Sequence, residues 1–314
     1  MIFAATLLAL PLIYLSFSMI QAIPKSLDAG DDSSYGAPVH LADLEDRSVK
    51  ESSGIAASRR HTNVFWTHND SGDGPFIYAV DREGKQRGVW RVTGAQARDW
   101  EDIAIGPGPV RDRHYLYIGD IGDNSKKRDH IIVYRVIEPQ VASAAASSTK
   151  KSAVNTAAAD AIRLKYPDGS YDAEALMVHP TTGDLYVVTK VMGGAAGVFS
   201  LKAPFPKTGI STLARVGEVR FPNPLGGFIT GGDISPDGRR VVLCDYLGAV
   251  ELVLPDSRGT AFDSIWKESL APVNIGSRRQ GEAICYRADG LALLATSEGL
   301  PCPLIEVARQ SSRR

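Results

Sequence analysis

One short motif recurs five times along the chain and constrains the fold more than any other feature. Each copy begins an apolar segment that runs into a turn rich in Gly, Asp or Pro, and two further apolar segments follow. Asp-Gly and Thr-Gly between apolar runs are typical of β-hairpins. The pattern therefore predicts an all-β fold built from repeated units. The five copies are Ser53-Gly54-Ile55, Glu101-Asp102-Ile103, Glu174-Ala175-Leu176, Gly232-Asp233-Ile234 and Glu282-Ala283-Ile284.

The spacing of these copies favours a β-propeller. Units of about 40–50 residues with four strands each are typical of propeller blades. The last copy leaves room for three strands, so we expect a strand between His40 and Val49 to supply the fourth and close the ring. We count five blades within residues 39–310, with six as the alternative if a long interval hides a degenerate blade. Residues 140–160, rich in Ala, Ser, Lys and Thr, are expected to form a solvated loop, and residues 311–314 a tail.

The amino terminus differs from the rest of the chain. Residues 1–23 carry no charged side chain and are rich in Leu, Ile, Ala and Phe. Two interpretations stay open: a cleaved signal peptide, or a retained anchor, because about 20 apolar residues can span a bilayer. Residues 24–38 are polar and small enough to be a linker. We expect an exported protein, periplasmic, extracellular or anchored to the outer face of the membrane, that contacts membrane through this segment alone.

Charge and cysteine content exclude several classes of function. Lys and Arg number 35 and Asp and Glu 36, a balance that argues against a nucleic-acid partner. Three cysteines are too few for a disulfide scaffold. Cys285 and Cys302 could pair in an oxidising compartment, and Cys244 is expected to be a buried thiol. GxSxG, Walker, HExxH and GxGxxG motifs are absent from the sequence. The expected partner is a small polar ligand or a protein, and the expected state is a monomer.

The repeated motif predicts an acidic end to the central channel. The first strand of each blade lines that channel, so the acidic residues of successive copies should converge there. Like charges that approach closely raise each other's pKa or recruit a cation, and hard oxygen ligands favour calcium or magnesium. We therefore predict a metal or ligand site, with Ca²⁺ as a candidate cofactor. Its residues are Glu101, Asp102, Glu174, Asp233 and Glu282.

A second motif, Asp-x-Gly-Asp followed by Gly or Asn, occurs twice after the second strand of a unit. The two copies are Asp70-Ser71-Gly72-Asp73-Gly74 and Asp120-Ile121-Gly122-Asp123-Asn124. Aspartate bonds the local backbone in turns, and glycine permits positive φ. The same carboxylates can also bind a metal or ligand, so Asp70, Asp73, Asp120 and Asp123 are candidates for either role.

Three further residues are candidates for chemistry at this end of the channel. His68 precedes an acidic loop and is the candidate general base, although a lone histidine is more often packed in a core. Lys190 falls at a corresponding place in a later unit and would favour a phosphate, sulfate or carboxylate. Trp100 is either a stacking wall for a ligand or an inter-blade packing residue.

These motifs together resemble those of a known group of proteins. The segments 51–56, 66–73, 99–104 and 119–124 resemble an uncharacterised group of exported bacterial β-propeller proteins. That group is loosely similar to the phytase-like, NHL-repeat and gluconolactonase-like propellers. The resemblance implies a propeller over about residues 45 to 310. The phytase-like propellers bind several calcium ions, and the gluconolactonase-like propellers hold a divalent ion in the channel.

Three functions remain open from the sequence. The first is an exported binding module with an acidic channel mouth. The second is a divalent-metal-dependent hydrolase of phosphoesters or lactones, in which His68 activates water. The third is a glycosidase with paired carboxylates. Fold alone does not choose among them.

Overall fold

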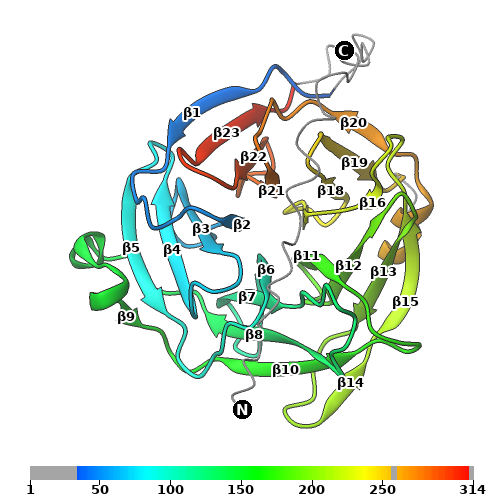
Figure 1. Cartoon of the computed structure of the whole chain (residues 1–314), viewed down its shortest axis with the longest axis horizontal. Coiled ribbons are helices and arrows are strands. Elements are labelled where there is room, and N and C mark those ends of the chain that lie inside the picture. The colour runs from blue at the N-terminus through cyan, green and yellow to red at the C-terminus, as the bar shows by residue number, and fades with distance from the viewer. Residues whose placement is uncertain (1–33, 256–259, 311–314) are drawn as a thin grey trace, which may run out of the picture. The chain divides into compact units, whose positions relative to one another are not determined.

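The computed structural model describes residues 34–255 and 260–310, and these form five β-sheets arranged around a central channel (Figure 1). The expected export segment, the first part of the linker and the tail lie outside the described residues. Within the described part of the chain, no helix is long and apolar enough to cross a bilayer. The chain is therefore an all-β, five-bladed propeller, as the motif count predicted.

Each blade is an antiparallel sheet whose first strand lies innermost. Blade one contains β2 (Ser52–Ala57), β3 (Val64–Asn69), β4 (Phe76–Asp81) and β5 (Gln86–Arg91). Blade two contains β6 (Trp100–Pro107), β7 (His114–Asp120), β8 (Ile131–Ile137) and β10 (Asp160–Lys165). Blade three contains β11 (Ala173–Val178), β12 (Leu185–Met192), β13 (Ala196–Leu201) and β15 (Ala214–Val219). Blade four contains β17 (Gly231–Ile234), β18 (Arg240–Cys244), β19 (Ala249–Val253) and β20 (Ala271–Val273).

The fifth blade closes the ring with a strand from the other end of the chain. It contains β21 (Gly281–Tyr286), β22 (Ala292–Ser297), β23 (Pro303–Ala308) and β1 (Val39–Asp43). β1 pairs antiparallel with β23, with Val39 opposite Glu306 and Asp43 opposite Pro303. The predicted closing strand is therefore confirmed, and it removes the exposed edge that β23 would otherwise present.

Short elements decorate the blades. β9 (Val154–Asn155) adds to β5 and β14 (Ile210–Thr212) to β10, both in parallel, and β16 (Gly226–Phe228) pairs with the end of β12. Three 3₁₀ helices complete the described elements: η2 (Ser143–Ser147), η3 (Lys150–Ser152) and η4 (Phe262–Lys267).

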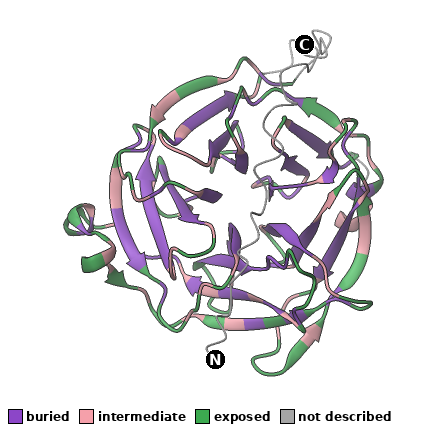
Figure 2. Cartoon of the chain, viewed as in Figure 1, coloured by how far each residue is buried: buried purple, intermediate pink, exposed green. Residues whose placement is uncertain are grey.

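The hydrophobic core is divided among the five interfaces between neighbouring blades. Each interface holds one cluster of buried side chains drawn from the two blades that face each other. Trp66 and Trp90 of blade one, for example, pack in the same cluster as Ile118 and Tyr134 of blade two. Figure 2 shows the inner strands buried and the outermost strands partly exposed. Burial of apolar area between blades is thus what holds the ring together.

The segment 140–160 is more ordered than a solvated loop. It contains η2, η3 and β9, and it lies against the outer strand of blade one. The hydroxyl of Ser148 accepts the Val89 N–H at 2.8 Å. Ala145 is buried against Gly88, where an added Cβ would lie 3.0 Å from the Ala145 methyl. Small side chains on both sides permit this close approach. The segment has no apolar periodicity, so the sequence pattern did not predict this packing.

The three cysteines are buried free thiols. Cys285 and Cys302 both belong to the core of the interface between blades one and five. They contribute there as small apolar side chains.

Candidate functional site

Glutamates reach the channel mouth because the inner strands carry β-bulges. In blade two, Trp100 pairs with Asp120 and Asp102 with Gly119, so Glu101 is left without a partner across the ladder. Glu174 is skipped in the same way in blade three. A bulge turns a side chain out of the sheet and is common next to functional sites. The same position that repeats in the sequence is therefore the one that the backbone directs out of the ladder.

The other blades vary this arrangement. In blade five the register shifts between Gly281 and Ile284, the stretch that contains Glu282. In blade one the shift falls at Ser53. In blade four the pairing runs without a shift, and Gly232 occupies the motif position. Three glutamates thus come from three blades, with small residues in the remaining two.

Lys190 contacts one of these glutamates and lies in the field of another. Its ammonium bonds the Glu174 carboxylate and lies 4.2 Å from the centre of the Phe228 ring and 5.4 Å from that of Tyr246. Burial lowers the pKa of Lys190, but the charges of Glu174 and Glu282 outweigh it and raise that pKa. Lys190 pairs with Phe228 where β16 lies antiparallel to the end of β12. This pairing supplies both the cation and one aromatic face.

A second pair of carboxylates is joined by one amide. Nε2 of Gln280 lies 3.1 Å from Oε1 of Glu282 and 2.5 Å from Oε2 of Glu298. Burial, and then the charge of Glu282, raises the pKa of Glu298 to about 8. Burial also raises the pKa of Glu282 and, well above its usual range, that of Glu174. Burial is the first cause in each case, because it disfavours the charged form of a carboxylate.

A third group of carboxylates adjoins Glu101. One oxygen from each of Asp70, Asp99 and Glu101 lies within 4.8 Å of the others. Burial, and then the charge of Asp70, raises the pKa of Asp99 to about 6. Burial and the charge of Glu174 raise the pKa of Glu101 well above its usual range. Electrostatic coupling to Glu174 links this group to the Lys190 region, so the mouth forms one acidic surface.

The second motif position has a different environment. Both oxygens of Asp102 accept main-chain N–H groups, from Ile103 at 2.8 Å and from Leu176 of the next blade at 2.9 Å. Asp233 accepts from Ile234 at 2.8 Å and from Tyr286 of the next blade at 2.9 Å. Both carboxylates are buried and join neighbouring inner strands. Their contacts are those of structural residues.

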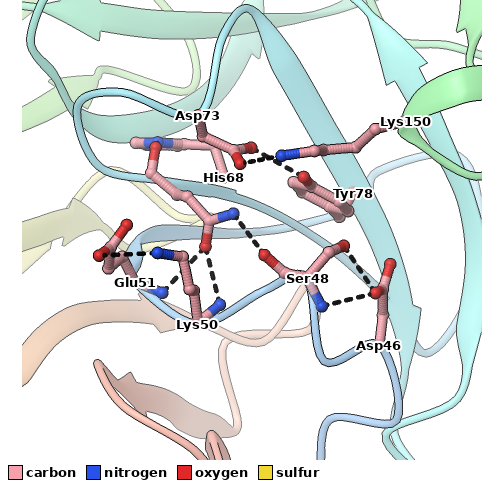
Figure 3. Close-up of polar contacts among 9 residues, drawn as sticks. Asp46, Ser48, Lys50, Glu51, His68, Asp73, Tyr78 and Lys150 are labelled. Carbon is pink, nitrogen blue, oxygen red and sulfur yellow. Dashed lines mark hydrogen bonds and ion pairs between the residues drawn. The ribbon is translucent and has the colours of Figure 1, made fainter.

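The remaining aspartates of the Asp-x-Gly-Asp loops also have partners within the protein. Asp73 receives Lys150 at 2.5 Å and the Tyr78 hydroxyl at 2.8 Å (Figure 3). Asp120 forms an ion pair with Arg128 at 2.7 Å. Asp123 accepts the main-chain N–H groups of residues 127 and 128. Of the four candidates in these loops, Asp70 is the one that the structure brings to the acidic group.

His68 and Trp100 are packed inside the propeller. Nδ1 of His68 lies 2.8 Å from the carbonyl oxygen of Asn69, and burial lowers the pKa of His68 to about 4. The rings of His68 and Trp100 meet edge to face with centroids 5.8 Å apart. Nε1 of Trp100 donates to the Gln96 carbonyl at 3.0 Å. Both side chains are completely buried, as expected of packing residues.

Sequence reasoning did not select Asp99, Gln280 or Phe228 as site residues. Asp99 stands two residues before Glu101, and its place beside a repeated acidic motif was a usable signal. Gln280 likewise stands two residues before Glu282. Phe228 belongs to a short strand outside the repeat, and nothing in the sequence pattern marks it.

Comparison of the chain with models of protein families, and with curated protein sequences, finds no match. The five sheets place the chain in the class of five-bladed β-propellers.

Proposed function

We propose that this propeller is a binding module whose acidic mouth takes a positively charged organic ligand, specifically a protonated alkylamine. The observation that carries the proposal is the contact set of Lys190. Its ammonium is held by a carboxylate and by two aromatic faces, which is the chemistry that recognises an alkylammonium group. The mouth thus already holds one group of the proposed class.

The charge around Lys190 supports a second cation. Glu174, Glu282 and Glu298 all have raised pKa values, although Lys190 lowers each of them. An ammonium placed near Gln280 would compensate Glu282 and Glu298, which share that amide. Exposed Met192 and Leu247 lie in the segments that carry Lys190 and Tyr246, and they offer apolar contact to an alkyl chain.

The same contacts disfavour the anionic ligand that Lys190 alone suggested. Its ammonium is engaged by Glu174, and a phosphate or carboxylate would meet several like charges. The hydrolase alternative stays a prediction without a supporting observation, because His68 is completely buried and its pKa is lowered.

The proposal is tested by thermal unfolding and calorimetry of the full chain with 1,5-diaminopentane. A ligand that binds the folded state raises the unfolding midpoint with concentration. We expect the diamine to raise it, and succinate at the same ionic strength to leave it unchanged. Glu282→Gln and Glu298→Gln should weaken diamine binding by at least about tenfold, since each removes one charge partner of the ammonium.

The matched control is Asp112→Asn, whose carboxylate is 90% exposed in the turn between β6 and β7. It should bind the diamine as the unaltered chain does. Stabilisation by succinate but not by the diamine would reverse the proposed charge preference. Equal diamine affinity in both glutamine variants would remove the proposed site.

A further inference from the structure

We infer that the mouth also contains a calcium site formed by Asp70, Asp99 and Glu101. These carboxylates differ from those assigned to the alkylamine, so the two sites can be tested separately. The three side chains come from the loop after β3, from the residue before β6, and from the bulge in β6. Their oxygens lie within 4.8 Å of one another.

The first support is the state of Glu101. Its side chain is 5% exposed, and within residues 34–255 and 260–310 no hydrogen bond or ion pair reaches its carboxylate. Burying an ionised carboxylate without a partner is unfavourable, so proteins pair such groups or coordinate metals with them. The unpaired carboxylate faces Asp70 and Asp99, whose charges are of the same sign. A cation at this point would supply the missing partner of Glu101 and offset the charges of Asp70 and Asp99.

The second support is the close approach of the backbone at Gly122. A Cβ added there would lie 2.5 Å from Oδ2 of Asp99 and still closer to Oε1 of Glu101. Any side chain at this position would push the two carboxylates out of their places. The φ angle of Gly122 is not positive, so the glycine is required by this approach rather than by the turn.

A buried arginine fixes the loop that carries Gly122. Nη1 of Arg128 donates to the Gly122 carbonyl at 2.9 Å and to the Asp120 carboxylate at 2.7 Å. Asp123 binds the main chain of residues 127 and 128 and completes the turn. The second Asp-x-Gly-Asp loop therefore holds the Gly122 backbone against the carboxylates of Asp99 and Glu101.

The chemistry of the group selects calcium. Its donors are all carboxylate oxygens, which are hard ligands. Magnesium is usually held by one or two carboxylates in a strict octahedron, whereas calcium accepts more oxygen ligands in irregular arrangements. One carboxylate from the loop after β3 and two from the start of β6 fit the larger ion.

The test uses Tb³⁺, which takes oxygen ligands as Ca²⁺ does and luminesces when a nearby tryptophan is excited. Trp100 directly precedes Glu101 in the sequence. We expect the full chain to give tryptophan-sensitised terbium luminescence that Ca²⁺ displaces, and calorimetry to detect Ca²⁺ directly. Asp99→Asn and Glu101→Gln should each weaken Ca²⁺ by at least about tenfold.

Gly122→Ala tests the geometry without removing a ligand, and it should also weaken Ca²⁺ by at least about tenfold. Its control is Gly248→Ala, because an added Cβ at Gly248 meets nothing within 4 Å. Asp112→Asn, at an exposed carboxylate outside the mouth, should bind Ca²⁺ as the unaltered chain does. Circular dichroism of each variant confirms that it is folded.

Two results would overturn the calcium site: terbium luminescence that Ca²⁺ does not displace, or full affinity in both Asp99→Asn and Glu101→Gln. Failure of the diamine to bind, with calcium binding intact, would contradict the proposed function alone. Failure of calcium with the diamine still bound would contradict this inference alone.

Discussion

Two adjacent residues of the repeated motif have opposite hydrogen-bonding environments. The first, as in Glu101, lies on a bulge and faces the mouth, where its charge is uncompensated. The second, as in Asp102, is saturated by main-chain N–H groups of its own strand and of the next blade. At this scale the function depends on hydrogen bonding: a carboxylate whose lone pairs are occupied by amides is structural, and one without partners is available to a ligand.

Asp233→Asn should lower the free energy of unfolding by about 1–3 kcal/mol. One carboxylate oxygen is replaced by an amide NH₂ group that faces the N–H of Ile234 or Tyr286, and two buried donors then oppose each other. Urea unfolding at pH 7.5 measures the loss. Asp112→Asn, at an exposed carboxylate, should change the free energy by less than about 0.5 kcal/mol. A similarly small effect at Asp233 would contradict the bridging role.

The raised pKa of Glu298 predicts how stability depends on pH. The folded state holds this proton up to about pH 8, whereas the unfolded chain releases it near pH 4.3. The folded state therefore binds more protons between these values, and the free energy of unfolding should fall as pH rises through that window. Urea unfolding from pH 5 to pH 8.5 should show a shallower fall in Glu298→Gln. Equal slopes in both proteins would contradict the raised pKa.

At the scale of elements, pairings outside the repeat close the ring and shape its mouth. β1 completes blade five, and the Tyr35 hydroxyl before it bonds Glu251 of blade four at 2.6 Å. The antiparallel pairing of β16 with the end of β12 places Lys190 and Phe228 at the mouth. The bulge in the inner strand of blade two directs Glu101 toward the mouth. Strands added to the repeat and irregularities within it thus close the ring and form the acidic mouth.

Replacing residues 34–43 by a Gly/Ser segment of equal length should lower the free energy of unfolding by several kcal/mol. β23 would lose its outer neighbour, and each ladder hydrogen bond contributes about 1 kcal/mol. Urea unfolding measures the change, and amide exchange of β23 should become faster. The same replacement of the exposed turn 207–209 is the control and should have little effect. Unchanged exchange of β23 would show that β1 does not close the ring.

At the scale of the whole molecule, the net charge of −1 hides a strongly uneven distribution. The five inner strands lie side by side around the channel, and three of them direct a glutamate to one end. Packing between blades supplies the stability that allows these like charges to remain close together. The stable propeller therefore tolerates the repulsion among the carboxylates at its mouth, and a bound cation would reduce that repulsion.

Much of this architecture could be predicted from the sequence. Five copies of one motif, each followed by hairpin signals, predict five blades, because every blade must bury the same pattern of side chains against its neighbours. The closing strand followed from the missing fourth strand of the last unit, and the convergence of glutamates from their position on the inner strands. These features repeat along the chain, so periodicity reveals them.

The tertiary structure alone decided which acidic residues remain without partners. Asp102 and Glu101 are neighbours in sequence, yet only the placement of the next blade supplies an amide to one of them. The fold brings together the side chains that pair with Asp73, Asp120 and Glu174. The approach of Gly122 to Asp99 depends on the loop that follows β7. Hydrogen bonding and burial are properties of three-dimensional neighbours, and a one-dimensional pattern does not contain them.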